Sequence, residues 1–237
     1  MADQSAKTVA TAVSITDERN VHVSGLLQIP SGGDARAGFV LAHSAGAGMD
    51  HPFLAAIADG LAARGIATLR YQFPYMEQGL KRPDPPKLAQ ATVRAAVATA
   101  RAALPELPLF AGGKSFGGRM TSQAQAAAPL QGVRGLVFLG FPLHPAGRPS
   151  AERGEHLFDV EVPMLFLQGT RDTLAALGEL QPLCKELGRR ATLKLYADAD
   201  HSFHVPARSG RKDAEIFGEL LDALADWVDD VLRRALP

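Results

Sequence analysis

The 237-residue sequence is short of cysteine, of net charge and of long apolar runs. Its single cysteine, Cys184, excludes a disulfide within the chain and favours a reducing compartment. Basic and acidic residues number 25 each, so no overall field attracts nucleic acid or an anionic membrane. No run approaches the ~18 apolar residues of a membrane span, and residues 1–7 are polar with no apolar signal segment behind them. We therefore expect a cytoplasmic protein that binds neither nucleic acid nor membrane.

What the sequence does contain is an alternation of short apolar runs and helical segments. Residues 8–15 and 21–29 predict an antiparallel hairpin, because β-branched residues alternate on both sides of a polar turn. Further strands are expected at 38–42, 66–71, 107–110, 135–139, 164–167 and 192–196. Helices are expected at 52–64, 88–104, 119–126, 174–187 and 213–234. This order predicts an α/β fold in one domain, 1–237, whose mostly parallel, doubly wound sheet carries helices on both faces.

The most informative segment is the Gly-x-Ser-x-Gly motif of residues 113–117, between an expected strand and an expected helix. Ser115 at the apex of this turn would project its hydroxyl off the sheet, where the helix N-terminus favours an oxyanion. The overlapping Gly-Lys-Ser is not a phosphate-binding P-loop, because Pro108 stands where that motif needs glycine. Gly46 and Gly48 lack the third glycine of a dinucleotide site, since that position is His51. No cofactor is expected.

Two later strand ends carry residues that would complete a catalytic triad. In open α/β sheets the chemistry lies beyond the carboxyl ends of the strands. Asp172 follows the strand that ends at Leu167, and His201 follows the strand that ends near Tyr196. The chain order Ser, Asp, His is that of α/β-hydrolases. We predict Ser115 as nucleophile, His201 as general base and Asp172 as the partner of His201.

Other nearby histidines and carboxylates fit these roles less well. His204 lies three residues beyond the expected position of the base. Asp198 and Asp200 fit solvated turn residues, because a carboxylate adjacent in sequence to a histidine rarely reaches its Nδ1. His43 fits a structural hydrogen bonder. No metal site is expected, because metal-ligand spacing to Cys, Asp or Glu is missing at the remaining histidines, His22, His51, His144 and His156.

The loop of residues 43–51 is expected to supply one donor of an oxyanion hole. A small residue there can present its backbone N–H to the serine; Ala45 is the first choice and Ser44 the second, with the N–H of Phe116 as the other donor. The short connection between residues 139 and 164 leaves no room for a large lid, so we expect an open site. The residues expected to contact substrate at its rim are Ser44, Phe73, Tyr75, Phe141 and His144, with Phe116, Leu143 and Phe203 as further candidates.

These segments resemble the α/β-hydrolase superfamily. Within it they resemble a small dienelactone-hydrolase-like group that includes the hydrolase-like subunit of a histone-acetylating complex. The matching segments are residues 41–52, 70–75, 113–119, 139–145, 168–172 and 200–203. The resemblance implies the α/β-hydrolase fold and the Ser-Asp-His triad. Dienelactone hydrolases use a cysteine nucleophile, whereas this chain has Ser115, so a serine esterase is the better interpretation.

We therefore predict a carboxylic ester hydrolase that acts on a small-molecule ester through an acyl-enzyme on Ser115. Acyl transfer or thioester hydrolysis on the same acyl-enzyme stays open. A non-catalytic interaction module also stays open, because some members of the resembling group serve as complex subunits. An exposed apolar face on the helix of residues 213–234 would indicate a homodimer.

Overall fold

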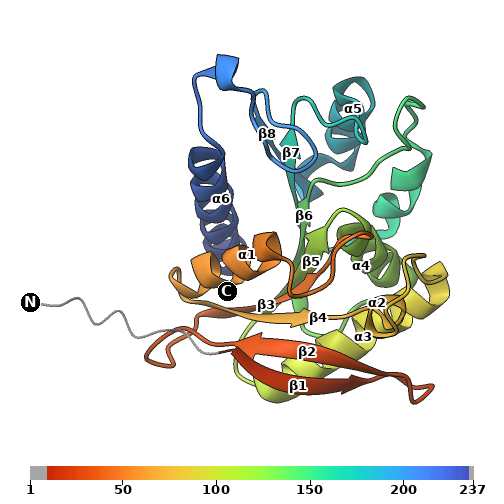
Figure 1. Ribbon diagram of the computed structural model, residues 1–237, viewed down its shortest axis with the longest axis vertical. Coiled ribbons are helices and arrows are strands. Elements are labelled where there is room, and N and C mark those ends of the chain that lie inside the picture. Colours follow the sequence, from red (N-terminus) through yellow and green to blue (C-terminus); the bar gives the residue numbers. More distant parts are fainter. Residues whose placement is uncertain (1–9, 235–237) are drawn as a thin grey trace, which may run out of the picture.

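Eight strands form one sheet in the computed structural model, which describes residues 10–234. Their order across the sheet is β1-β2-β4-β3-β5-β6-β7-β8, with the β1–β2 hairpin at one end and β8 at the other (Figure 1). The strands are β1 (Ala10–Thr16), β2 (His22–Gln28), β3 (Ala37–Ala42), β4 (Ile66–Tyr71), β5 (Leu109–Lys114), β6 (Val133–Leu139), β7 (Met164–Gly169) and β8 (Ala191–Tyr196).

Only the N-terminal hairpin interrupts the parallel arrangement. β1 pairs antiparallel with β2 and β2 with β4, whereas the strands from β4 to β8 pair in parallel. The predicted fold class, a mostly parallel sheet with an antiparallel hairpin, is therefore confirmed. Residues 8 and 9 at the predicted start of the hairpin, and the polar residues 1–7, lie outside the described residues.

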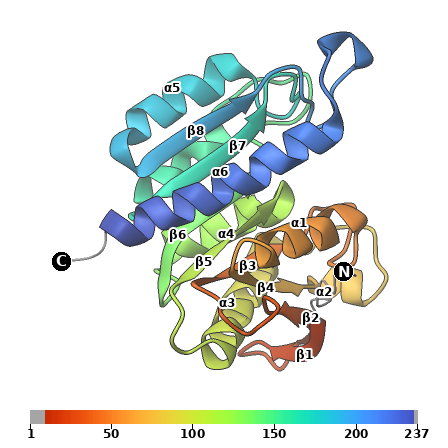
Figure 2. The same cartoon turned by 90° about the vertical axis from the view of Figure 1, so that its left-hand side faces the viewer.

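Helices cover both faces of the sheet. α1 (Pro52–Ala62) and α6 (Asp213–Arg234) pack into the apolar core on one face, where Figure 2 shows them in front of the strands. α3 (Pro86–Ala103), α4 (Phe116–Ala127) and α5 (Leu177–Leu187) pack into the core on the opposite face. Because every parallel strand runs in one direction, the loops that follow them meet at a single edge.

The last helix, α6, uses its apolar face inside the chain. Buried residues recur along it at Ile216, Leu220, Leu224 and Val228 and pack against α1 and the sheet. Two ion pairs fix its polar side, Arg36 to Asp229 and Arg64 to Asp222, each at 2.6 Å. Along the described residues 213–234 of α6 no large apolar side chain is fully exposed, but Phe217 is partly exposed and lines a surface pocket beside Phe53. The homodimer stays a prediction.

Several short elements differ from the predicted pattern: α2 (Pro74–Glu77), η1 (Glu152–Asp159), η2 (Gly188–Arg190) and η3 (Ala207–Ser209). A four-residue helix and 3₁₀ turns are too short to show an apolar period. η1 is the only helical segment in the connection from β6 to β7, and it packs on α4, which confirms the absence of a large lid. Among residues 10–234 no helix is long and apolar enough to cross a membrane.

Candidate active site

Ser115 occupies a strained turn between β5 and α4. Its φ of 51° and ψ of −115° are unusual for a residue with a side chain. The turn needs glycine on both sides. A Cβ on Gly113 would lie 2.2 Å from the carbonyl oxygen of Ala42, and one on Gly117 would lie 2.5 Å from that of His43. The two glycines of the motif thus let β3 and its following loop approach the serine closely.

The structure brings Ser115, His201 and Asp172 together in one hydrogen-bonded chain. His201 Nε2 lies 2.9 Å from Ser115 Oγ, and His201 Nδ1 lies 2.6 Å from Asp172 Oδ2. The Asp172 side chain is fully buried, whereas that of His201 is 23% exposed. With its Nδ1–H directed at the carboxylate, His201 presents the unprotonated Nε2 to the serine hydroxyl.

Both oxygens of the Asp172 carboxylate accept hydrogen bonds. Its Oδ1 accepts the N–H of Leu174 at 2.8 Å, and its Oδ2 also accepts from the Gln168 side chain. The loops after β7 and β8 are joined next to it, where the N–H of Arg171 donates to the carbonyl of Ala199 at 2.8 Å. Gly169 allows that approach, because a Cβ there would lie 2.3 Å from the same carbonyl.

Lys114, the residue before the serine, is a buried cation beneath the histidine. Its ammonium donates to the backbone carbonyl of His201 and lies 5.4 Å from the ring centre of Phe203. Burial lowers the pKa of Lys114 to about 8, against the opposing attraction of Asp172 and Asp200. Sequence reasoning missed this contact, although a lysine at the end of an otherwise apolar strand is a signal for it.

His43 fixes the loop that follows β3. Its Nε2 accepts the N–H of Phe73 at 3.0 Å, so Nδ1 carries the proton and donates to the carbonyl of Ser44 at 2.7 Å. Burial lowers the pKa of His43 to about 4, so the ring is neutral at pH 7. The structural role expected for His43 matches these contacts.

Tyr75 holds the same loop from the core. Its hydroxyl donates to the carbonyl of Ala45 at 2.9 Å and approaches that of Ser44 at 3.3 Å. In a trans peptide the C=O and the next N–H point in opposite directions. Because His43 and Tyr75 hold the Ser44 carbonyl, the Ala45 N–H points away from these buried rings. Within residues 10–234 neither that N–H nor the N–H of Phe116 donates to a protein acceptor.

The expected substrate rim needs correction. Phe73, Tyr75 and Phe141 are at most 1% exposed, so they lie in the core and cannot line an open rim. His144 is buried too: its Nε2 accepts the N–H of Ala176 at 2.7 Å and its Nδ1 meets the carbonyl of Pro145. Leu143 and Phe203 are buried as well. Ser44, Ala45 and Phe116 are only partly buried and remain accessible.

The alternative triad members lie elsewhere. His204 Nδ1 pairs with Asp213 Oδ2 at 2.6 Å, and both side chains are largely exposed. Asp200 Oδ1 accepts the N–H groups of Ser202 and His204, which makes it a turn residue of the loop that carries His201. Asp198 has a positive φ of 59° in the turn after β8. None of these three groups hydrogen-bonds to Ser115 or His201 in the described part of the chain.

The sheet is mostly parallel and wound on both faces, and a strained serine follows β5. With an aspartate after β7 and a histidine after β8, this order defines the α/β-hydrolase class. Comparison with known families agrees: the chain belongs to the family described as alpha/beta hydrolase domain, which matches residues 35–229.

Solved structures share this fold over nearly the whole chain. A lidless α/β serine hydrolase from Xanthomonas campestris is 23% identical, with a TM-score of 0.69 and coverage of 98% of this chain and 97% of that one. A dienelactone hydrolase from Anabaena variabilis is 21% identical, with a TM-score of 0.72 and coverage of 97% and 99%. The esterase domain of a Rhodothermus marinus protein is 16% identical, with a TM-score of 0.69 and coverage of 92% and 97%. The resemblance to small, dienelactone-hydrolase-like proteins is confirmed.

Proposed function

We propose that this protein is a serine hydrolase that cleaves carboxylic esters through an acyl-enzyme on Ser115. The observation that carries the proposal is the chain of contacts from Ser115 Oγ to His201 Nε2, at 2.9 Å, and from His201 Nδ1 to Asp172 Oδ2, at 2.6 Å. Both distances are short enough for His201 to take the proton of Ser115 and for Asp172 to orient His201. The esterase names of several fold relatives are consistent with this reaction.

In the first half of the reaction Ser115 Oγ attacks the acyl carbon of the ester while His201 Nε2 takes its proton. Asp172 holds the histidine in the tautomer that accepts that proton and stabilises the imidazolium. The tetrahedral intermediate collapses as the C–O bond to the alcohol breaks and His201 returns the proton to the leaving oxygen. Water then attacks the acyl-enzyme by the same relay and releases the acid.

The oxyanion of each tetrahedral intermediate is assigned to the backbone N–H groups of Ala45 and Phe116. Phe116 begins α4, so its N–H is one of the helix donors without an intrahelical acceptor. His43 and Tyr75 both donate hydrogen bonds to the Ser44 carbonyl and so keep the Ala45 N–H in a fixed direction. Fixed donors stabilise developing charge without reorganisation, which is why they contribute strongly to the rate.

The decisive experiment is hydrolysis of p-nitrophenyl acetate, butyrate and octanoate by the wild type and by Ser115→Ala. We expect Ser115→Ala to lose at least about 10⁴-fold in kcat with an unchanged fold. Ser14→Ala is the matched control, because Ser14 is an exposed serine on β1 at the far edge of the sheet. A fluorophosphonate should add one phosphonyl group, on Ser115.

Undiminished turnover by Ser115→Ala, or labelling of another residue, would contradict the proposal. A folded wild type that hydrolyses no ester or thioester would favour the interaction module instead. Release of thiol from acyl thioesters and transfer of the acyl group to added alcohols separate the alternative acyl reactions. All of them share the acyl-enzyme on Ser115.

We also propose that residues 1–237 act as one cytoplasmic domain on a small-molecule ester, without a cofactor and without binding nucleic acid. The near-neutral charge balance and the buried, unpaired thiol of Cys184 support this setting. Burial raises the pKa of that thiol to about 12, so it stays protonated and unreactive.

A further inference from the structure

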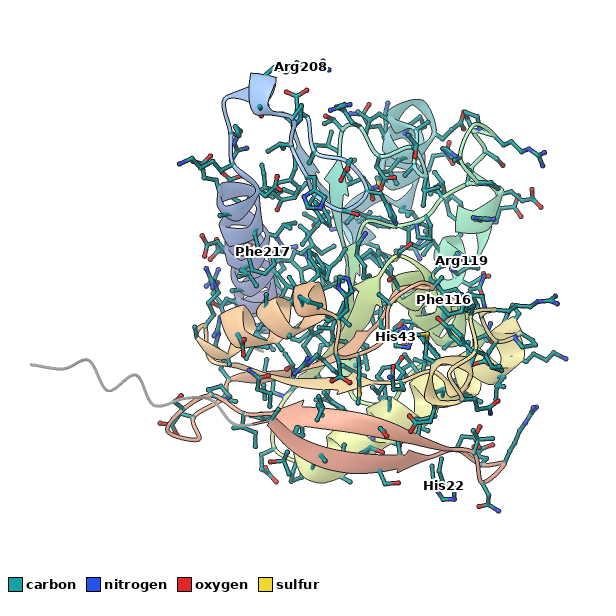
Figure 3. The ribbon with its side chains drawn as sticks, in the orientation of Figure 1. His22, His43, Phe116, Arg119, Arg208 and Phe217 are labelled. Carbon is teal, nitrogen blue, oxygen red and sulfur yellow. The ribbon has the colours of Figure 1, made fainter. Side chains whose placement is uncertain are left out.

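A cavity of about 470 Å³ opens beside the first turns of α4. Arg119 and Gln123 line it from α4, and Arg153 and His156 line it from η1. Leu143 and His144, two of the expected rim residues, line it from the loop after β6, although little of either side chain is exposed. Arg119 lies four residues after Ser115, which is one helical turn or on the order of 6 Å along α4. Figure 3 shows Arg119 next to Phe116, at the side of the molecule where α4 meets η1.

Two guanidinium groups face this cavity without a counterion. Within residues 10–234 neither Arg119 nor Arg153 has a carboxylate oxygen within 4.0 Å, and neither side chain makes a hydrogen bond. Arg119 Nε is buried and unsatisfied. The two groups are close enough for the charge of Arg153 to lower the pKa of Arg119, in addition to the effect of burial. Both arginines are partly buried, so two like charges this close repel each other and gain no ion-pair energy from the fold.

The other polar groups around the cavity do not neutralise the arginines. Burial and the charge of Arg119 lower the pKa of His156 to about 4, so this ring is neutral and its Nε2 meets Ser122 Oγ at 2.8 Å. Glu152 and Glu155 line the same cavity but are exposed, and in the described part of the chain neither has an oxygen within 4.0 Å of Arg119 or Arg153. Neither arginine therefore has a counterion in the cavity among the described residues, and the amide of Gln123 is an additional donor there.

We propose that this cavity binds the anionic group of the substrate, a carboxylate or a phosphate, so that the ester cleaved at Ser115 carries an acidic group. Guanidinium forks bind both oxyanions with paired hydrogen bonds. The bound anion would supply the counterion that Arg119 and Arg153 lack and would hold the ester carbonyl one helical turn away, at Ser115. This inference about substrate class rests on the proposed function of Ser115.

The kinetic test compares two esters with the same leaving group, p-nitrophenyl hydrogen adipate and its neutral methyl ester. We expect the wild type to prefer the anionic ester by roughly 10- to 100-fold in kcat/KM, the range of a charged hydrogen-bonded contact. Arg119→Gln and Arg153→Gln should each reduce this preference at least about fivefold. Arg208→Gln is the control, because Arg208 is exposed on η3, far from the cavity (Figure 3), and its preference should equal that of the wild type.

A binding test keeps the inference separate from the hydrolase proposal. Calorimetry of Ser115→Ala with adipate and with inorganic phosphate should detect binding of at least one anion, lost when Arg119→Gln is added and kept when Arg208→Gln is added. The anion that binds tells carboxylate from phosphate. If both esters are hydrolysed through Ser115 at equal rates and neither anion binds, the anionic substrate class is wrong while the hydrolase stands. If neither ester is hydrolysed but an Arg119-dependent anion binds, the site stands and the hydrolase does not.

Discussion

The two halves of this site treat buried charge in opposite ways. At the triad every polar group has a partner: Asp172 accepts from Leu174, Gln168 and His201, and His201 in turn meets Ser115. Arg119, one turn along α4, and Arg153, on η1, have none among the described residues. A fully paired network is built for positioning, since each member fixes the next. Unpaired cations add no ion-pair energy to the stability of the folded chain, so we assign them to the binding of a ligand.

After Ser115→Ala, the largest effect on kcat should come from breaking the hydrogen bond between Asp172 and His201. In Asp172→Asn the amide oxygen stays with the Leu174 N–H, so the NH₂ faces His201 Nδ1 and forces the proton onto Nε2. That tautomer cannot accept a proton from Ser115, and we expect kcat to fall about 10³- to 10⁴-fold. Steady-state kinetics on p-nitrophenyl butyrate measures this fall. A loss below tenfold would show that the carboxylate does not orient the base.

Acid should destabilise the fold through two histidines, His43 and His156, that are neutral when the chain is folded. The pKa of His43 and that of His156 are both lowered to about 4, below the 6.5 of an unfolded chain. Between these pH values the unfolded chain binds more protons, so the free energy of unfolding falls as pH drops from about 6.5 to 4. Fully buried His43 alone should account for roughly 3 kcal/mol.

Urea melts of the wild type between pH 7 and pH 4 measure the slope of the free energy of unfolding against pH. His43→Gln should have a shallower slope, because it removes the buried ring whose pKa folding lowers. Equal slopes in the two proteins would mean that folding does not lower the pKa of His43.

A smaller effect is expected where the core holds the oxyanion loop. Tyr75→Phe removes the hydroxyl that donates to the Ala45 carbonyl and approaches the Ser44 carbonyl, so the Ala45 N–H gains freedom. We expect kcat to fall about tenfold with little change in KM, because the oxyanion exists only after attack. Tyr71→Phe is the matched control, a buried hydroxyl that does not bond to residues 43–45. A change confined to KM would place Tyr75 outside this role.

The smallest expected effect is on the melting temperature, and it tests the unpaired Arg119. Arg119→Gln removes one of two facing charges and breaks no hydrogen bond or ion pair. The melting temperature of the ligand-free protein should therefore stay unchanged or rise, by about 1–3 °C. Arg36→Gln should lower it, because that side chain pairs with Asp229. A clear loss of stability in Arg119→Gln would mean that Arg119 is a structural residue, paired in solution with Glu152 or Glu155.

The sequence was sufficient for the sheet and for the grouping of Ser115, Asp172 and His201, because those depend on local order. Apolar runs identify parallel strands, and parallel strands send their following loops to one edge. Boundaries were harder. The strand before the serine was predicted to end at Phe110 but extends through two glycines to Lys114, where a Cβ at Gly112 would lie 1.9 Å from the carbonyl oxygen of Val137. Close strand contact, not side-chain propensity, selects glycine there.

Side-chain depth could not be predicted in the same way. Phe73, Tyr75 and Phe141 follow strand ends and looked suited to a rim, yet they turn into the core. The helix expected from Leu174 begins only at Leu177, after a turn in which the Leu174 N–H donates to the Asp172 carboxylate. Arg119 and Arg153 were missed because their significance is the missing counterion, which depends on three-dimensional packing.

The separation of the triad along the chain has a consequence for synthesis. Ser115 and His201 are 86 residues apart, and each follows a different strand. At about 5–20 residues per second, a ribosome makes the serine roughly 4–17 s before the histidine. During that interval Ser115 is an ordinary alcohol with no base beside it. Under the proposed mechanism, Ser115 of the nascent chain therefore cannot be acylated with the help of His201 until all eight strands have been made.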